Sequence, residues 1–136
     1  MALTLIKGDS VTIRIDSRTR FGVDLLARLG RTTVTEVISQ QIRERLAQAL
    51  PKCDVDGREV GLLDAVWDEY EQDRMVKLAV HAPDLLSPEE QKLWRVISED
   101  RKYLPKSGRP NFAAIRDNWR LIKDKVKDYE DSAKEP

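Results

Sequence analysis

Side chains that could perform catalysis are sparse in this sequence. His81 is the only histidine and Cys53 the only cysteine, so neither belongs to a Cys/His cluster with the spacing of a metal site. Asp68 and Glu69 are adjacent on an expected helix, so their carboxylates point in different directions. The chain also lacks a phosphate-binding glycine loop and a nucleophile elbow. We therefore expect no enzyme activity, no cofactor and no bound metal.

Hydrogen-bonding side chains with a regular spacing do occur near the N-terminus. The polar residues Ser10, Thr12, Arg14 and Asp16 alternate with the apolar residues Val11, Ile13 and Ile15. A period of two predicts a half-buried β-strand with one face in water. Such a short strand has no partner within its own segment, and its backbone groups need one. An identical strand from a second copy would provide it, as an antiparallel two-stranded ribbon on a two-fold axis.

Two helices are expected directly after this strand. The first has its apolar residues Phe21, Leu25, Leu26 and Leu29 at helical spacing, and Gly30 is placed to end it in a left-handed conformation. Thr32 or Thr33 can cap the second helix, and Glu36, three residues after Thr33, would complete a capping box. The apolar stripe of this second helix consists of Val34, Val37, Ile38, Ile42 and Leu46.

This order of elements resembles the ribbon-helix-helix DNA-binding family, and most closely its Arc repressor type. The resemblance covers about residues 8–48 and is carried by the alternation in VTIRID, the helix after it and the turn Gly30-Arg31-Thr32-Thr33-Val34-Thr35-Glu36. It implies that the paired strands lie in the major groove of DNA, where a two-stranded ribbon fits. It also implies that their polar face reads the base edges.

Matched position by position, the resemblance implies a role for each of several residues. Ser10, Thr12 and Arg14 would read bases, and arginine can bond both major-groove acceptors of guanine, worth about 1–3 kcal/mol of discrimination. Free N–H groups at the start of the second helix would bind a phosphate. The residues implied to contact phosphates are Lys7, Arg18, Arg20, Thr32, Thr33 and Val34. Those implied to form the dimer core are Val11, Ile13, Ile15, Val37, Ile38 and Ile42.

The resemblance is incomplete at one structural feature. Arc-type members carry a buried arginine–glutamate–arginine triad. Arg31 and Glu36 match its first two positions, but Gln40 stands at the third. The resemblance therefore implies at most an Arg31–Glu36 pair in this chain. A simpler interpretation of Thr12 and Arg14 is the solvent face of an edge strand, where charge discourages aggregation.

Charge is distributed unevenly along a chain whose formal net charge is zero. Residues 1–50 contain eight basic and five acidic side chains. Residues 53–73 contain one basic and eight acidic side chains, whereas residues 101–127 contain nine basic and two acidic ones. Such asymmetry concerns partners and packing rather than fold. Its simplest interpretation is that the acidic and basic segments face each other or the solvent.

The sequence predicts a mainly α fold with two domains. Residues 1–50 would form the ribbon-helix-helix domain, residues 51–61 a linker beginning at Pro51, and residues 62–136 a three-helix module. In this module we expect a helix from Leu62 to a stop at Ala82-Pro83, a helix capped by Ser87 and a helix capped by Asn111. The aromatic residues of the module are expected in its core. No apolar run is long enough for a membrane span, and one cysteine indicates a reducing compartment, so we expect a cytoplasmic location.

The expected function is sequence-specific binding of double-stranded DNA by a homodimer, most simply as a transcriptional repressor, with dimers of dimers possible on DNA. Two alternatives use the same N-terminal domain: an antitoxin whose C-terminal part binds a toxin, and an accessory protein of plasmid transfer or partition. A third alternative is that residues 1–50 only dimerise while residues 62–136 bind a protein partner.

Overall fold

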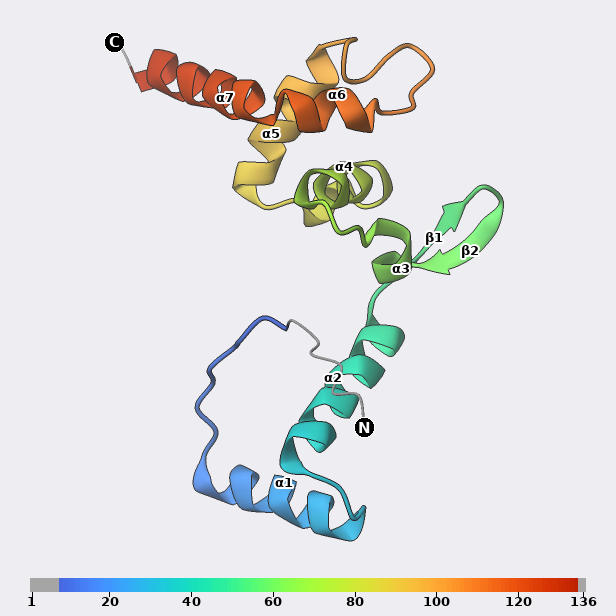
Figure 1. Ribbon diagram of the computed structural model, residues 1–136, viewed down its shortest axis with the longest axis vertical. Helices are drawn as coiled ribbons and strands as arrows, with labels where there is room; N and C mark the ends of the chain where they lie inside the picture. The colour runs from blue at the N-terminus through green and yellow to red at the C-terminus, as the bar shows by residue number, and fades with distance from the viewer. Residues whose placement is uncertain (1–7, 135–136) are drawn as a thin grey trace, which may run out of the picture. The chain divides into compact units, whose positions relative to one another are not determined.

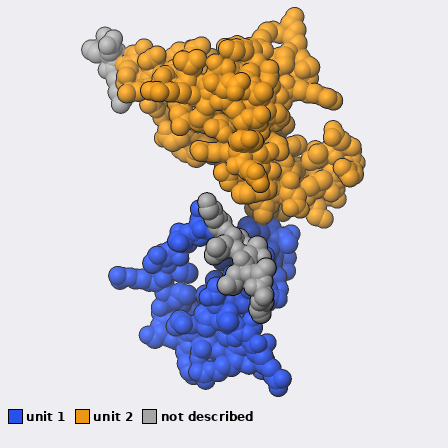
Figure 2. Space-filling view, viewed as in Figure 1, with its two compact units in different colours: residues 1–48 blue, residues 49–136 orange. Residues whose placement is uncertain are grey.

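The computed structural model describes residues 8–134, and the chain divides into two compact units, residues 1–48 (unit 1) and 49–136 (unit 2) (Figure 2). The described residues are mainly helical and contain a single sheet of two antiparallel strands. The mainly α class predicted from the sequence is therefore confirmed. Within the described range, no helix is both long and apolar enough to cross a lipid bilayer.

Unit 1 consists of an extended segment, residues 8–16, followed by helices α1 (Ser17–Leu29) and α2 (Val34–Ala49) (Figure 1). Asp16 begins α1, because its carboxylate accepts the backbone N–H of Thr19 at 3.0 Å and the hydroxyl of Thr19 at 2.7 Å. Both hydrogen bonds lower the pKa of the Asp16 carboxyl group, and the bond from the Thr19 hydroxyl has the larger effect. Asp16 thus ends the extended segment as the cap of a helix.

Unit 2 begins with a hairpin in residues that the sequence analysis assigned to a linker. Strand β1 (Lys52–Val55) pairs with β2 (Arg58–Gly61), with Val55 opposite Arg58. The turn between them is Asp56-Gly57, and both residues have positive φ, 52° and 83°. Asp-Gly is a preferred pair for two-residue hairpin turns because both positions need this conformation. The N–H of Gly57 also donates to the carboxylate of Asp54 at 2.8 Å.

The first helix expected in unit 2 is interrupted. Helix α3 (Leu62–Val66) ends at Trp67, and α4 (Glu71–His81) begins four residues later. The interruption has a local cause, since the carboxylate of Asp68 accepts the N–H of Tyr70 at 3.0 Å and thereby favours a turn. Lys77 binds the other oxygen of Asp68 at 3.0 Å. Trp67 and Tyr70 beside this turn are exposed, so the expectation that they belong to the core is wrong.

The remaining helices follow the expected caps more closely. A 3-10 turn (Pro83–Leu85) leads to α5 (Pro88–Glu99), where Ser87 and Glu90 form the complete capping box. Asn111 caps α6 (Phe112–Asp117), and α7 (Trp119–Lys134) continues after a break at Asn118. With α3 and α4, these make five α-helices among the described residues of unit 2, where the sequence predicted three.

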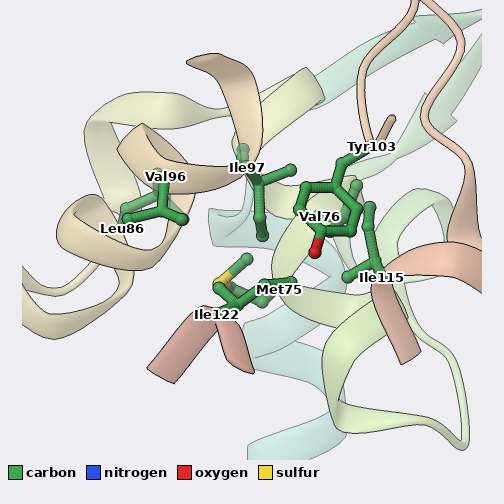
Figure 3. Packing of buried hydrophobic residues seen from close by; sticks show 9 residues of the cluster. Met75, Val76, Leu86, Val96, Ile97, Tyr103, Ile115 and Ile122 are labelled. Atoms are coloured by element: carbon green, nitrogen blue, oxygen red, sulfur yellow. The ribbon is translucent and has the colours of Figure 1, made fainter. Parts of the chain in front are cut away.

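The hydrophobic core lies in unit 2, where α4, α5, α6 and α7 meet (Figure 3). Its fully buried side chains are Val76, Ile97, Ile115 and Ile122. The spacing of Phe112, Ile115, Trp119, Ile122, Val126 and Tyr129 by three and four residues predicts one apolar stripe along the expected last helix. Of this stripe, Ile115 and Ile122 are fully buried, and Phe112, Trp119 and Val126 pack against the same cluster. Tyr129 is 53% exposed, so the prediction is wrong at that residue. Full burial of such a side chain stabilises the fold by about 1.5–3 kcal/mol. Unit 2 therefore has a core of its own.

One ion pair is enclosed by this packing. Asp73 of α4 is 6% exposed, and its Oδ2 atom accepts from the guanidinium of Arg116 of α6 at 2.5 Å. The guanidinium also lies over the ring of Tyr70, 4.6 Å from the centroid. The second carboxylate oxygen, Oδ1, is buried and has no hydrogen-bond partner among the described residues. Asp73 therefore depends on Arg116 to compensate its buried charge.

We predict that Asp73→Ala lowers the free energy of unfolding by about 3 kcal/mol, because it leaves the partly buried charge of Arg116 without its partner. Urea unfolding followed by circular dichroism measures this change. The matched control is Glu99→Ala, which removes an exposed carboxylate that pairs with Arg95 and should change stability by roughly 0–1 kcal/mol. Equal effects of the two substitutions would contradict the structural role assigned to Asp73.

Candidate nucleic-acid interface

The extended segment of unit 1 exposes both of its faces. Ser10, Thr12 and Arg14, the predicted base-reading residues, are all exposed. On the alternate positions Val11 is 83% exposed and Ile13 is 64% exposed. Among the described residues, nothing pairs with this segment as a β-strand. Within residues 8–134, the segment therefore lacks a paired strand and leaves the apolar side chains of Val11 and Ile13 open to water.

The helices of unit 1 do not bury this apolar surface either. Ala27 is the only buried residue among those described in unit 1, and α1 and α2 make few close contacts with each other. Of the predicted dimer-core residues, Ile15, Val37 and Ile38 are half-buried and Ile42 is exposed. Further exposed large apolar side chains are Phe21, Leu25, Leu26, Leu29 and Leu46. Residues 8–48 of unit 1 thus form no complete core among themselves.

A hollow in unit 1 collects several of these apolar side chains. Its volume is about 410 Å³, and it lies where the extended segment approaches the start of both helices. Its apolar lining consists of Val11, Ile13, Ile15, Val23, Val34 and Ile38, with Thr12 and Arg20 completing it. Apolar side chains placed in this hollow by another molecule would lose contact with water.

The turn that orients α2 relative to α1 differs from the sequence prediction. Gly30 has φ −87°, and the left-handed residue is instead Arg31, with φ 51°. The N–H of Arg31 donates to the carbonyl of Arg28 at 3.2 Å, and that of Thr32 donates to the carbonyl of Ala27 at 2.9 Å. This is the bonding of a Schellman motif, with arginine at the position that glycine usually occupies.

The start of α2 offers free hydrogen-bond donors. The hydroxyl of Thr33 accepts the N–H of Glu36 at 3.1 Å, which confirms Thr33 as the cap. Among the described residues, the N–H groups of Thr33 and Val34 have no acceptor. The N–H of Thr32 is already used in the turn, so only its exposed hydroxyl could bind a phosphate. The positive end of the helix dipole lies at the same place, which suits an anion.

Two predicted interactions of Glu36 do not form in the described chain. Its carboxylate pairs with Arg43 at 2.9 Å, and neither completes the capping box nor pairs with Arg31. The Glu36–Arg43 pair is exposed, so it does not match the buried arginine–glutamate–arginine triad of the Arc type. Gln40, at the third triad position, donates to Glu44 at 3.3 Å.

Arginines surround the extended segment and the start of α1. Arg14, Arg18 and Arg20 are exposed, and none of them forms an ion pair among the described residues. Lys7, the fourth predicted cation, lies outside the described residues. A cation without an internal partner can attract a phosphate at long range.

In the described part of the chain, Asp54, Asp56, Lys77 and His81 line one hollow of unit 2. No group of three histidine, cysteine or acidic side chains there is placed to hold a metal ion. His81 is in the last turn of α4, and Cys53 is a free thiol in β1 whose Sγ atom lies 3.6 Å from the carbonyl of Val60.

The position of the left-handed residue leads to a prediction with an internal control. Arg31→Gly should raise the stability of unit 1 by about 1 kcal/mol, because glycine adopts positive φ without a Cβ penalty. Gly30→Ala should be tolerated or stabilise by about 0.4–1 kcal/mol, since its Cβ would lie 3.4 Å from the nearest atom, the Leu26 carbonyl oxygen. Thermal unfolding measures both, and a large loss for Gly30→Ala would show that Gly30 is the left-handed residue.

Comparison with known proteins adds no family to this geometry. No protein-family model, no curated protein and no solved structure matches the chain. The features of unit 1 that bear on function are its exposed apolar side chains and the free N–H groups of Thr33 and Val34.

Proposed function

We propose that the protein is a homodimeric, sequence-specific DNA-binding protein of the ribbon-helix-helix type that represses transcription, including that of its own gene. One observation carries this proposal: the extended segment 8–16 and the helices after it expose apolar side chains, and the segment pairs with no strand among residues 8–134. Both needs are met at once by a second copy whose segment pairs antiparallel with the first.

Dimerisation in this form gives each side chain of the segment a defined face. Val11, Ile13 and Ile15 enter the shared core together with Val34 and Ile38, which line the same hollow, and the second copy covers that hollow. Each of these side chains contributes about 1.5–3 kcal/mol when it is fully buried. Ser10, Thr12 and Arg14 then all point to the opposite face of the ribbon, because successive side chains along a strand point to opposite faces.

The exposed face of the ribbon enters the major groove of DNA. Arg14 bonds the two acceptors of a guanine, and Thr12 either hydrogen-bonds a base or places its methyl group against thymine. The free N–H groups of Thr33 and Val34 bind a phosphate beside the groove, which sets the register of the ribbon. Arg18 and Arg20 add attraction that does not depend on sequence.

The direct test is a titration of the purified protein with the DNA upstream of its own gene and with a scrambled duplex of the same length, at two salt concentrations. Autoregulatory recognition requires tighter binding to the upstream DNA at both concentrations. Equal binding to both duplexes that collapses with salt would exclude the upstream DNA as the target. Absence of any binding would refute the proposed function and favour a protein partner.

We predict that Arg14→Ala weakens binding to the specific duplex by about 1–3 kcal/mol, and that it relaxes the preference for guanine at one position of each half-site. Arg45→Ala is the matched control, since Arg45 is an exposed arginine in a later turn of α2 and lies outside the proposed interface. Fluorescence anisotropy at fixed salt compares the two. Identical losses would mean that Arg14 acts only through its charge.

The register of the ribbon is tested by placing the same charge on neighbouring positions. Ile13→Glu should abolish the dimer, because it places a carboxylate in the shared core. Thr12→Glu should leave the dimer intact and prevent DNA binding, because it places a negative charge against the DNA. Analytical ultracentrifugation and anisotropy measure the two properties, and the opposite pattern would show that the register is shifted by one residue.

A further inference from the structure

One hollow of unit 2 lies where the hairpin, α4 and the loop that leads to α6 come together. Asp54, Val55 and Asp56 of the hairpin line it with residues of α3, α4 and the loop, and we call it the hairpin hollow. Its volume is about 630 Å³, which is within the range of small-molecule sites. Figure 1 shows the hairpin and this loop on the same side of α4.

Apolar side chains form one part of the wall of the hairpin hollow. Val80 of α4 is 48% exposed, and the half-buried residues Val55, Ala65 and Phe112 line the hollow with it. A hydrocarbon group placed against these side chains would remove their surface from water. This part of the wall therefore suits a ligand that has an apolar portion.

Two carboxylates of the hairpin line the same hollow. Asp54 lies in β1 and Asp56 in the turn, and both side chains are exposed. One oxygen of Asp54 accepts the N–H of Gly57 at 2.8 Å, so Asp54 also holds the turn. Neither carboxylate forms an ion pair among the described residues. Both can therefore accept hydrogen bonds from a cation in the hollow.

Side chains with nitrogen donors line other parts of the wall. Lys77 and His81 lie on α4, and Lys77 is already bound to Asp68 at 3.0 Å. Arg109 belongs to the loop before α6 and is exposed, and it forms no ion pair among the described residues. Its guanidinium is therefore available to an anion in the hollow, and such a group can bind a carboxylate through two parallel hydrogen bonds.

The opposite charges share the hairpin hollow without pairing with each other. Among the described residues, no ion pair joins Arg109 to Asp54 or Asp56, so their charged atoms lie more than 4.0 Å apart. A simple anion or a simple cation would bind one side of the hollow only. A molecule that carries both an ammonium and a carboxylate can bind both sides at once.

We propose that the hairpin hollow binds a small zwitterion with an apolar portion, of the class of free amino acids and short peptides. Its ammonium donates to Asp54 and Asp56, its carboxylate accepts from Arg109, and its apolar portion covers Val80 and Phe112. The lining residues all belong to unit 2, so this site does not depend on the DNA binding proposed for unit 1.

The test titrates the full chain, without DNA, with L-leucine and with the dipeptide leucyl-leucine, whose charged groups lie farther apart. The N-acetylated form of each probe lacks the ammonium, and the amidated form lacks the carboxylate. NMR of isotope-labelled protein follows the backbone N–H signals of the hairpin and of Arg109. At least one zwitterion should bind with a Kd of about 1 mM or tighter. Each of its two capped forms should bind about tenfold more weakly, because each loses a charge-assisted hydrogen bond.

Two variants assign the ends of the ligand. Arg109→Ala should weaken the zwitterion about tenfold and leave binding of the amidated form unchanged, because that form has no carboxylate for Arg109 to bind. Asp56→Asn should weaken the zwitterion and leave the acetylated form unchanged, and asparagine also tolerates the left-handed turn conformation. The matched controls Arg120→Ala and Asp84→Asn change exposed residues outside the hollow and should have no effect.

Three results would overturn the proposal. The first is that neither zwitterion shifts the hairpin signals at about 10 mM. The second is that the capped forms bind as tightly as the zwitterions, and the third is that a variant at Arg109 or Asp56 binds like the wild type. Circular dichroism checks that each variant folds. All these measurements are made without DNA, so they stand apart from the outcome of the DNA titration.

Discussion

The unpaired backbone and uncovered apolar side chains of residues 8–16 are the constraint on which unit 1 depends. The segment has Val11 and Ile13 in water, and only Ala27 is buried among the described residues of the unit. A chain cannot be stable while it exposes such a surface without compensation, since burial supplies most of the folding free energy. The proposed dimer and its DNA-reading face both follow from meeting this need with a second copy.

Unit 2 buries apolar side chains within a single chain. Its core side chains come from α4, α5, α6 and α7, so residues far apart in sequence bury one another. Most charged side chains of unit 2 lie outside this core, with acidic residues concentrated in 53–73 and basic residues in 101–127. The two units therefore present different unsatisfied surfaces: apolar and extended in unit 1, charged with a few aromatic residues in unit 2.

Features with a local cause were predictable from the sequence. The caps by Thr33, Ser87 and Asn111 involve side chains and N–H groups three residues apart, so the residue types alone specify them. The hairpin at Asp56-Gly57 also has a local signal, but its strands of four residues each are too short to show a clear alternation of polar and apolar residues. The break at Asp68 is local too, although the apolar spacing across it continues as if the helix were unbroken.

The sequence by itself determined the helical class, the caps at Thr33, Ser87 and Asn111, and the apolar positions from Phe112 to Val126 that pack in the core, because each depends on neighbours along the chain. Only the tertiary structure decided that Asp73 and Arg116 pair across 43 residues, that Trp67 and Tyr70 face water, and that Arg31 rather than Gly30 is left-handed. These outcomes depend on how the elements pack, and packing energy outweighs the small conformational preferences of single residues.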